Sequence, residues 1–167
     1  MPERRAGYDR AGMPGLHYFA YGSNMNPSLM VERCPSADHP LPGLLEGFRL
    51  EFSVYSDVWK GGAANIEPDP EGHVWGVVWN VDADGMKHLD TFQGHPTFYR
   101  RERVVVRCDG ENIECLTYRV AHQHGYVRPT DQYLLTVRGA IARQGLPEEA
   151  YELLDRAARP PTPRIST

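Results

Sequence analysis

The segment HVWGVVWNV, residues 73–81, constrains the fold more than any other part of the sequence. It is rich in Val and Trp and is apolar along nearly its whole length. β-branched and aromatic residues favour strands. A strand with so little polar alternation is typical of one that is buried on both faces. The segment therefore predicts an interior strand of a sheet that is covered on both sides.

The rest of the chain shows strand-like patterns in its middle and helix-like patterns towards its end. We expect further strands at residues 16–21, 43–56 and 63–66, and a hairpin of strands 98–108 and 111–120 around an Asp-Gly turn signal. A loop is expected at residues 35–42 and a turn after residue 66. Helices are expected at residues 27–34, 82–93, 131–144 and 147–158. This order predicts an α+β fold around a curved or closed sheet.

The ends of these helices carry local signals. Asn26 and Thr130 are N-cap residues by type and position, and Pro27 suits the first position of a helix. Gly94 and Gly145 follow the last apolar positions of their helices and are typical C-terminal stop signals. The helix boundaries are therefore among the better defined features of the sequence.

Composition limits the classes of function. The chain has 167 residues, which suits one domain, and we expect this domain at residues 16–158, with flexible tails at 1–15 and 159–167. A net charge of −4 argues against a nucleic-acid binder, and no apolar run is long enough to span a membrane. The three cysteines form no Cys-x-x-Cys motif, and the pair His122 and His124 lacks a third ligand, so we expect no metal. Reduced cysteines favour a cytoplasmic location.

The stretch YFAYGSN contains the first candidate for chemistry. An aromatic strand runs into Tyr21, Gly22, Ser23 and Asn24, and a helix follows at once. Glycine allows a close approach of ligand to backbone, and successive N–H groups ahead of a helix bind negative charge. Such a loop can hold a carboxylate or an oxyanion. The alternative is a plain strand–turn–helix junction in which Asn24 satisfies its own turn.

The stretch LDTFQG, residues 89–94, contains the second candidate. A residue in the last turn of a helix, just before a glycine, can project into a cleft, and a Glu there would suit a general base. Here the residue is Gln93, which cannot titrate but can donate and accept hydrogen bonds. The alternative is a partly exposed amide at a helix end.

Four blocks in this order resemble the γ-glutamylcyclotransferases. They are YFAYGSNMN, GGAANI with VWGVVW, LDTFQG with FYRR, and RPTDQYLLTVRGA, and the resemblance covers residues 16–154. It implies a small mixed β-barrel with flanking helices. It also implies a cofactor-free reaction, in which the α-amine of a γ-glutamyl group attacks its own γ-carbonyl. The products are 5-oxoproline and a free amine or amino acid.

The resemblance also implies roles for particular residues. The loop Tyr21–Asn24 corresponds to the cradle for the γ-glutamyl group, and Tyr99, Tyr118 and Tyr133 correspond to tyrosines that line the substrate pocket. The family's general acid/base Glu corresponds to Gln93. The chain as written is therefore expected to be impaired in catalysis.

Three explanations for Gln93 are open. The first is an engineered Glu→Gln substitution, which the intact flanking pattern favours. The second is a pseudoenzyme, a non-catalytic module that binds γ-glutamyl ligands. The third is an enzyme with another base, for which Asp90 and His95 are the nearby candidates.

The substrate's amine half is the least defined part of this hypothesis. Family members act on γ-glutamyl amino acids, γ-glutamyl amines or γ-glutamyl-protected intermediates. We expect the loops at residues 55–60 and 121–128 to contact this half, and the rings of Tyr55, Trp59 and Tyr126 favour an apolar or cationic amine. Arg100 or Arg101 is a candidate partner for a substrate carboxylate. The expected state is a monomer or homodimer that binds a small molecule and neither nucleic acid nor membrane.

Overall fold

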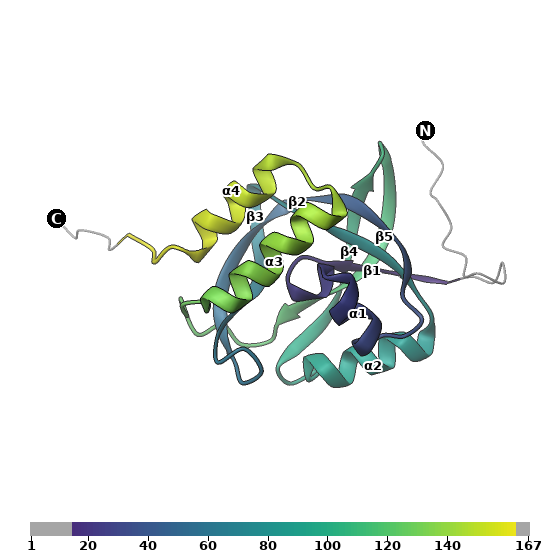
Figure 1. Ribbon diagram of the computed structural model, residues 1–167, viewed down its shortest axis with the longest axis horizontal. Helices are drawn as coiled ribbons and strands as arrows, with labels where there is room; N and C mark the ends of the chain where they lie inside the picture. Colours follow the sequence, from purple (N-terminus) through teal and green to yellow (C-terminus); the bar gives the residue numbers. More distant parts are fainter. Residues whose placement is uncertain (1–14, 163–167) are drawn as a thin grey trace.

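The computed structural model describes residues 15–162 and contains a five-stranded closed barrel with helices around it (Figure 1). The strand order in the barrel is β1-β3-β2-β4-β5. The expected α+β class with a closed sheet is confirmed. The elements are β1 (Leu16–Ala20), the 3-10 helix η1 (Ser23–Met25), α1 (Pro27–Arg33), β2 (Asp38–Ser56), β3 (Gly61–Val81), α2 (Ala83–Gln93), β4 (Tyr99–Cys108), β5 (Glu111–Val120), α3 (Asp131–Gln144) and α4 (Glu148–Ala158).

A long antiparallel hairpin of β2 and β3 forms much of the barrel wall. These strands are 19 and 21 residues long and are joined by the turn at residues 57–60. On the other side of β3, β1 pairs antiparallel, with Tyr18 opposite Trp79. A parallel contact between Tyr18 and Leu116 joins β1 to β5 and closes the barrel. Within residues 15–162, closure leaves no open edge of this sheet for pairing with other chains.

The expected loop at residues 35–42 is wrong in its second half. β2 begins at Asp38, and Pro42 lies opposite Val77 in the ladder. Proline lacks an N–H group and is tolerated in a strand at an edge or next to a bulge. A register shift between Asp38 and Leu41 provides that irregularity here.

The expected break between the strands at residues 63–66 and 73–81 is also wrong, because β3 runs through both. Pro68 lies opposite Phe48 and His73 lies opposite Glu46, so residues 69–72 bulge out of the ladder. The turn signals of this stretch are real, but they produce a bulge rather than an end. The flanking segments stay in one strand because both pair with β2.

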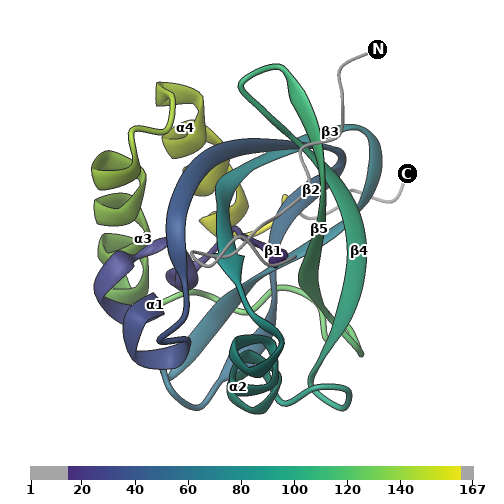
Figure 2. The same ribbon diagram turned by 90° about the vertical axis from the view of Figure 1, so that its right-hand side faces the viewer.

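The interior of the barrel wall confirms the expectation for residues 73–81. Val77 and Val78 are fully or almost fully buried, and so is Trp79. Figure 2 shows α1, α3 and α4 along one side of the barrel and α2 at one end. The helices cover the outer face of the strands there, so both faces of β3 at residues 76–79 lie away from water. The α3 stripe confirms this packing, with Val137 and Ile141 buried.

The expected helix ends are confirmed. The Asn26 side chain accepts hydrogen bonds from the N–H groups of Ser28 and Leu29, and the Thr130 side chain accepts one from the N–H of Tyr133. Gly94 and Gly145 have φ values of 65° and 69°, the left-handed conformation of a helix stop. These are local interactions, which is why short motifs predict them well.

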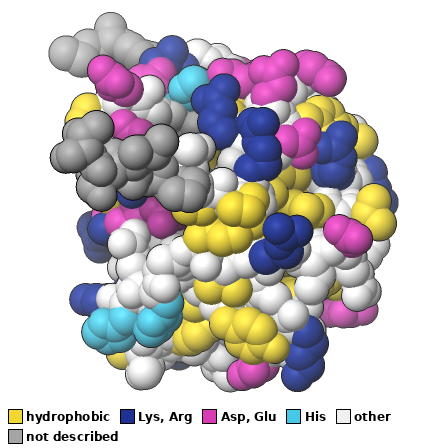
Figure 3. Space-filling model, turned by 90° about the vertical axis from the view of Figure 1, so that its left-hand side faces the viewer, with side chains coloured by type: hydrophobic (Ala, Val, Ile, Leu, Met, Phe, Trp, Pro, Cys, Tyr) yellow, Lys and Arg dark blue, Asp and Glu magenta, His cyan; other side chains and the backbone are white. Residues whose placement is uncertain are grey.

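The two expected tails lie largely outside the residues that the structure describes. Residues 1–14 and 163–167 are not described, and residues 159–162 follow α4 without regular structure. The limits of the domain at residues 16–158 stay a prediction. No helix within residues 15–162 is long and apolar enough to cross a membrane. On the face shown in Figure 3, acidic and basic side chains are interspersed with hydrophobic ones.

Candidate active site

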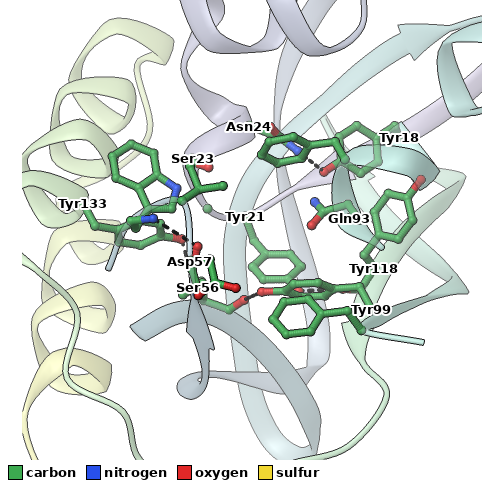
Figure 4. Close-up of a pocket in the computed structure, with 17 residues that line it drawn as sticks. Tyr18, Tyr21, Ser23, Asn24, Ser56, Asp57, Gln93, Tyr99, Tyr118 and Tyr133 are labelled. Carbon is green, nitrogen blue, oxygen red and sulfur yellow. Dashed lines mark hydrogen bonds between the residues drawn. The ribbon is translucent and has the colours of Figure 1, made fainter. Parts of the chain in front are cut away.

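One pocket brings the sequence-predicted residues together at the end of the barrel near α2 (Figure 4). Its volume is about 240 Å³. All eight residues of the predicted site line it. The lining residues are Tyr18, Tyr21, Gly22, Ser23, Asn24, Ser56, Asp57, Val58, Trp59, Ala63, Ala64, Phe92, Gln93, Phe98, Tyr99, Tyr118 and Tyr133.

The loop from Tyr21 to Asn24 is held on both sides by hydrogen bonds. The Tyr21 hydroxyl donates to the carbonyl oxygen of Tyr118 over 2.6 Å. The Asn24 amide donates to the Tyr18 hydroxyl over 2.9 Å, and the Asn24 carbonyl accepts from the Trp79 indole over 3.0 Å. The loop therefore has a fixed geometry before any ligand arrives, which lowers the entropic cost of binding.

Gly22 is required by close packing within the loop. A Cβ atom at this position would lie 2.6 Å from the hydroxyl oxygen of Tyr133. That hydroxyl also accepts a hydrogen bond from the N–H of Ala64 over 3.2 Å, so it is not free to move away. The Tyr99 hydroxyl donates to the carbonyl oxygen of Ala64 over 2.8 Å. One residue of β3 thus aligns tyrosines from α3 and β4.

The tyrosine hydroxyls of the pocket are neutral at physiological pH. Burial raises the pKa of Tyr18 and of Tyr133 to about 12. Burial also raises the pKa of Tyr21, Tyr99 and Tyr118 well above the ordinary value. These groups can orient a substrate by hydrogen bonds, but they cannot accept a proton near pH 7.

Gln93 is the last residue of α2 and faces this pocket. Gly94 ends the helix directly after it. In Figure 4 the Gln93 side chain lies between Tyr18 and Tyr118. Gln93 is half-buried, as the alternative of a partly exposed amide at a helix end expects, and it also lines the pocket.

Asp90 and His95, the two alternative bases, do not line the pocket. The Asp90 carboxylate accepts two hydrogen bonds from Arg101, each over 2.7 Å, and one from the Tyr118 hydroxyl over 2.6 Å. Burial raises the pKa of Asp90, but the bonds from Arg101 and Tyr118 outweigh it and hold that pKa below its usual value. A carboxylate bound in this way is a poor base.

The contacts of Arg100 and Arg101 bear on the hypothesis that one of them binds a substrate carboxylate. The Arg101 side chain donates to the Asp90 carboxylate, and its backbone N–H donates to Nδ1 of His95 over 3.2 Å. Arg100 donates to the carbonyl oxygen of Ala121 over 3.1 Å. Neither arginine lines the pocket, so the proposed contact with a substrate carboxylate is wrong for this pocket.

We predict that Asp90→Asn lowers the free energy of unfolding by about 1–3 kcal/mol at pH 7, because it weakens charge-assisted hydrogen bonds. The folded-state pKa of Asp90 is depressed, so its stabilisation is present above the unfolded value near 4 and is lost as the pH falls through the folded value. Urea unfolding at pH 7 and pH 3 should show a difference from the parent that shrinks in acid.

The matched control for this change is Asp155→Asn. Asp155 pairs with Arg138 over 2.9 Å, but both side chains are well exposed. Exposed ion pairs contribute about 0–1 kcal/mol, so this variant should unfold almost like the parent. Equal losses for the two variants would contradict the structural role of Asp90.

Arg33 supports the site from outside the pocket lining and was not predicted from the sequence. Arg33, at the end of α1, donates to Ser23 Oγ over 2.9 Å and to Asn24 Oδ1 over 2.7 Å. Its guanidinium also lies 4.0 Å from the centre of the Phe92 ring. Arg33 thereby links the loop to the end of α2. An arginine ten residues beyond a loop carries no local signal for such a contact.

The expected walls for the second half of a ligand are partly correct. Ser56, Asp57, Val58 and Trp59 line the pocket. Tyr55 and the segment 121–128 do not. The Tyr126 hydroxyl instead donates to the carbonyl oxygen of Ala158. No group of three or more His, Cys, Asp or Glu residues that could hold a metal ion occurs in the described part of the chain.

Comparisons with known proteins point to one family. Residues 18–135 match the family model described as "Gamma-glutamyl cyclotransferase, AIG2-like". The γ-glutamylcyclotransferase of Bos taurus is 32% identical over 144 residues, which cover 83% of this chain and 76% of the relative. The Homo sapiens protein of the same name is 32% identical over 143 residues, covering 82% and 76%. A solved structure named "Gamma-glutamyl cyclotransferase" has a TM-score of 0.80 at 32% identity, covering 91% of this chain and 94% of that one.

Proposed function

Because the chain belongs to the gamma-glutamyl cyclotransferase, AIG2-like family, we propose that its pocket binds a γ-glutamyl amide and converts it into 5-oxoproline and a free amine or amino acid. The relatives with that name support an enzyme of this type. The observation that carries the proposal is the single pocket that unites the loop Tyr21–Asn24, three further tyrosines and position 93. A cytoplasmic location, as a monomer or a homodimer, stays a prediction.

The pocket offers a place for each part of a γ-glutamyl group. The loop Tyr21–Asn24 precedes α1, so its backbone N–H groups are candidates to bind a carboxylate or an oxyanion. The neutral hydroxyls of Tyr99, Tyr118 and Tyr133 would orient the amide. A volume of about 240 Å³ lies below the range of about 300–1,000 Å³ typical of drug-sized ligands, which favours a small substrate.

The reaction needs one group that first accepts and then returns a proton. With Glu at position 93, the carboxylate would take a proton from the substrate's α-ammonium. The freed nitrogen would attack the γ-carbonyl, and a new C–N bond would close a five-membered ring. The amide C–N bond would then break as the carboxyl group returns the proton to the departing amine, and the ring nitrogen would lose its extra proton to the released amine or to water, leaving the N–H of 5-oxoproline. Ring closure is favoured because both reacting groups belong to one molecule.

Gln93 limits what this chain can do. An amide keeps the shape of a carboxylate and loses the base. We therefore propose that the chain as written binds a γ-glutamyl amide but turns it over slowly. This same observation favours a second function, a non-catalytic module that holds γ-glutamyl ligands. Asp90, His95 and the pocket tyrosines do not supply the missing base in the arrangement described above.

The test compares two amides with the same amine, one γ-glutamyl and one glutaryl, using the Gln93→Glu form. The glutaryl amide has the same chain without the α-amine, so it cannot cyclise. We expect equal amounts of 5-oxoproline and amine from the γ-glutamyl amide and no cleavage of the glutaryl amide. Release of free glutamate, or equal cleavage of both amides, would contradict cyclisation. Binding without any release would favour the module.

A further inference from the structure

We propose that Asp57 selects substrates whose departing amine carries a positive charge at its far end. This inference rests on the proposed function and concerns the half of the pocket that the γ-glutamyl group does not use. The residues concerned are Asp57 and the exposed hydrophobic side chains around it. They come from the β2–β3 turn and from the segment that joins α2 to β4.

Asp57 supplies the charge of this pocket. Of the 17 lining residues, which all belong to the described part of the chain, it is the only one with a formal charge at neutral pH. Within residues 15–162 no hydrogen bond or ion pair engages its carboxylate. Arg33, which is half-buried, does not line the pocket and is bound to Ser23 and Asn24. Lys60 shares the turn with Asp57 but does not line the pocket.

Hydrogen bonds and ring packing hold the turn that carries Asp57 in place. The N–H of Lys60 donates to the carbonyl oxygen of Ser56 over 2.8 Å, and the N–H of Trp59 donates to Ser56 Oγ over 3.2 Å. The Trp59 ring packs edge-on against Tyr133, with ring centres 5.2 Å apart. These contacts fix the backbone of the turn and so hold Asp57 and Val58 at the pocket.

Large hydrophobic side chains at the pocket are exposed to solvent. Val58 is 67% exposed, Phe98 is 42% exposed and Phe92 is 39% exposed. All three line the same pocket. Exposed large hydrophobic side chains that gather at a pocket mark a binding surface. A methylene chain running over them would bury apolar area on both partners.

The position of Asp57 assigns it to the departing amine. Figure 4 shows Asp57 and Ser56 beside Tyr133, while Gln93 lies on the opposite side of the pocket between Tyr18 and Tyr118. The proton transfer is proposed at position 93, so the α-amine and the γ-carbonyl belong on that side. The chain beyond the γ-amide then passes the hydrophobic residues and ends near Asp57. An ammonium group there is attracted, and a carboxylate is repelled.

The test measures binding to the unmodified chain, whose turnover is expected to be slow. Three γ-glutamyl amides of similar length are titrated calorimetrically: the N-pentyl, the N-(4-aminobutyl) and the N-(3-carboxypropyl) amide. We expect the cationic amide to bind roughly 3–10-fold more tightly than the anionic one, the range for a partly exposed ion pair and the matching repulsion. High salt should reduce this ratio, because exposed charges are screened.

The variant that tests the assignment is Asp57→Asn, which should bring the ratio of the two dissociation constants to about 1. The matched control is Asp84→Asn, at an exposed position of α2 that does not line the pocket, and it should leave the ratio unchanged. A ratio near 1 in the unmodified chain, or the same ratio in Asp57→Asn, overturns the inference. An equal weakening of all three amides also overturns it, because Asp57 would then bind the α-ammonium that they share.

The proposed reaction is judged separately on the Gln93→Glu form. If that form releases no 5-oxoproline from any of the three amides while the charge preference is present, the reaction fails and the role of Asp57 stands. If 5-oxoproline is released without any charge preference, the reaction stands and the role of Asp57 fails. If none of the amides binds, both are overturned.

Discussion

Replacing Gln93 by Glu is expected to raise the rate of 5-oxoproline release from a γ-glutamyl amide by roughly 10²–10⁴-fold, the usual contribution of a positioned general acid/base. The change adds no atoms to the side chain and turns an amide into a group that can accept a proton. The pocket around position 93 is lined by tyrosines that stay neutral at physiological pH. No other lining group on that side of the pocket can do the same work.

The pH dependence of this variant gives an independent readout. Burial beside Tyr18 and Tyr118 should raise the pKa of a Glu above its ordinary value near 4.3, because an ionised carboxylate loses hydration there. The base must be ionised to act, so kcat/KM should rise with pH through that pKa. In the unmodified chain Gln93 cannot ionise, so position 93 should cause no such rise of kcat/KM with pH.

The matched control for this substitution is Gln132→Glu. Gln132 is exposed on α3, next to Tyr133 in sequence, and does not line the pocket. This substitution introduces the same new charge outside the pocket. It should therefore leave the rate of 5-oxoproline release at the level of the parent. A rate for Gln93→Glu no higher than that of the control, together with intact binding, would identify the protein as a binding module.

Replacing Gly62 by Ala is expected to lower the free energy of unfolding by about 3 kcal/mol or more, which is a large effect for a single methyl group. A Cβ atom at Gly62 would lie 2.0 Å from the carbonyl oxygen of Val127 and 2.9 Å from its carbonyl carbon. Both are backbone atoms, so no side-chain rotation can relieve the contact. The N–H of Gly62 also donates to the carbonyl oxygen of Arg128 over 2.8 Å, which fixes the two segments together.

Thermal unfolding should show this effect as a fall in Tm of roughly 6–12 °C for a chain of this size. The segment at residues 127–130 leads into α3, which carries Tyr133 into the pocket, so ligand binding should weaken as well. The same substitution at Gly139 is the control. A Cβ atom there meets nothing within 4 Å, and the position lies inside α3. Gly139→Ala should leave stability unchanged or raise it by up to about 1 kcal/mol.

Comparison of these two glycines shows the limit of local reasoning. Both are Gly residues within regular elements, and the sequence alone assigns neither a close neighbour. Only the pairing of β3 with the segment 127–128 makes one of them indispensable. If Gly139→Ala lowered the free energy of unfolding as much as Gly62→Ala does, close contact with the backbone of residues 127–128 would not explain the effect at Gly62.

Much of the fold could be predicted from the sequence because its signals act over a few residues. The N-cap at Asn26, the stops at Gly94 and Gly145, and the buried run at residues 73–81 all follow from local chemistry and periodicity. The errors at residues 38–42 and 67–72 have the opposite origin. Pro and Gly signals there were outweighed by long-range pairing between β2 and β3.

The features of the candidate site fall into the same two groups, those that local sequence predicts and those that depend on long-range contacts. The sequence by itself determined which residues matter in the loop Tyr21–Asn24 and at Gln93, because short blocks with a recognisable order contain them. Only the tertiary structure decided that Asp90 is bound to Arg101, and that Asp57 faces the pocket instead. Closure of the barrel brings segments from β1, β2, α2 and β5 to one end. Contacts between segments so far apart depend on strand pairing and packing, and no short stretch of sequence encodes them.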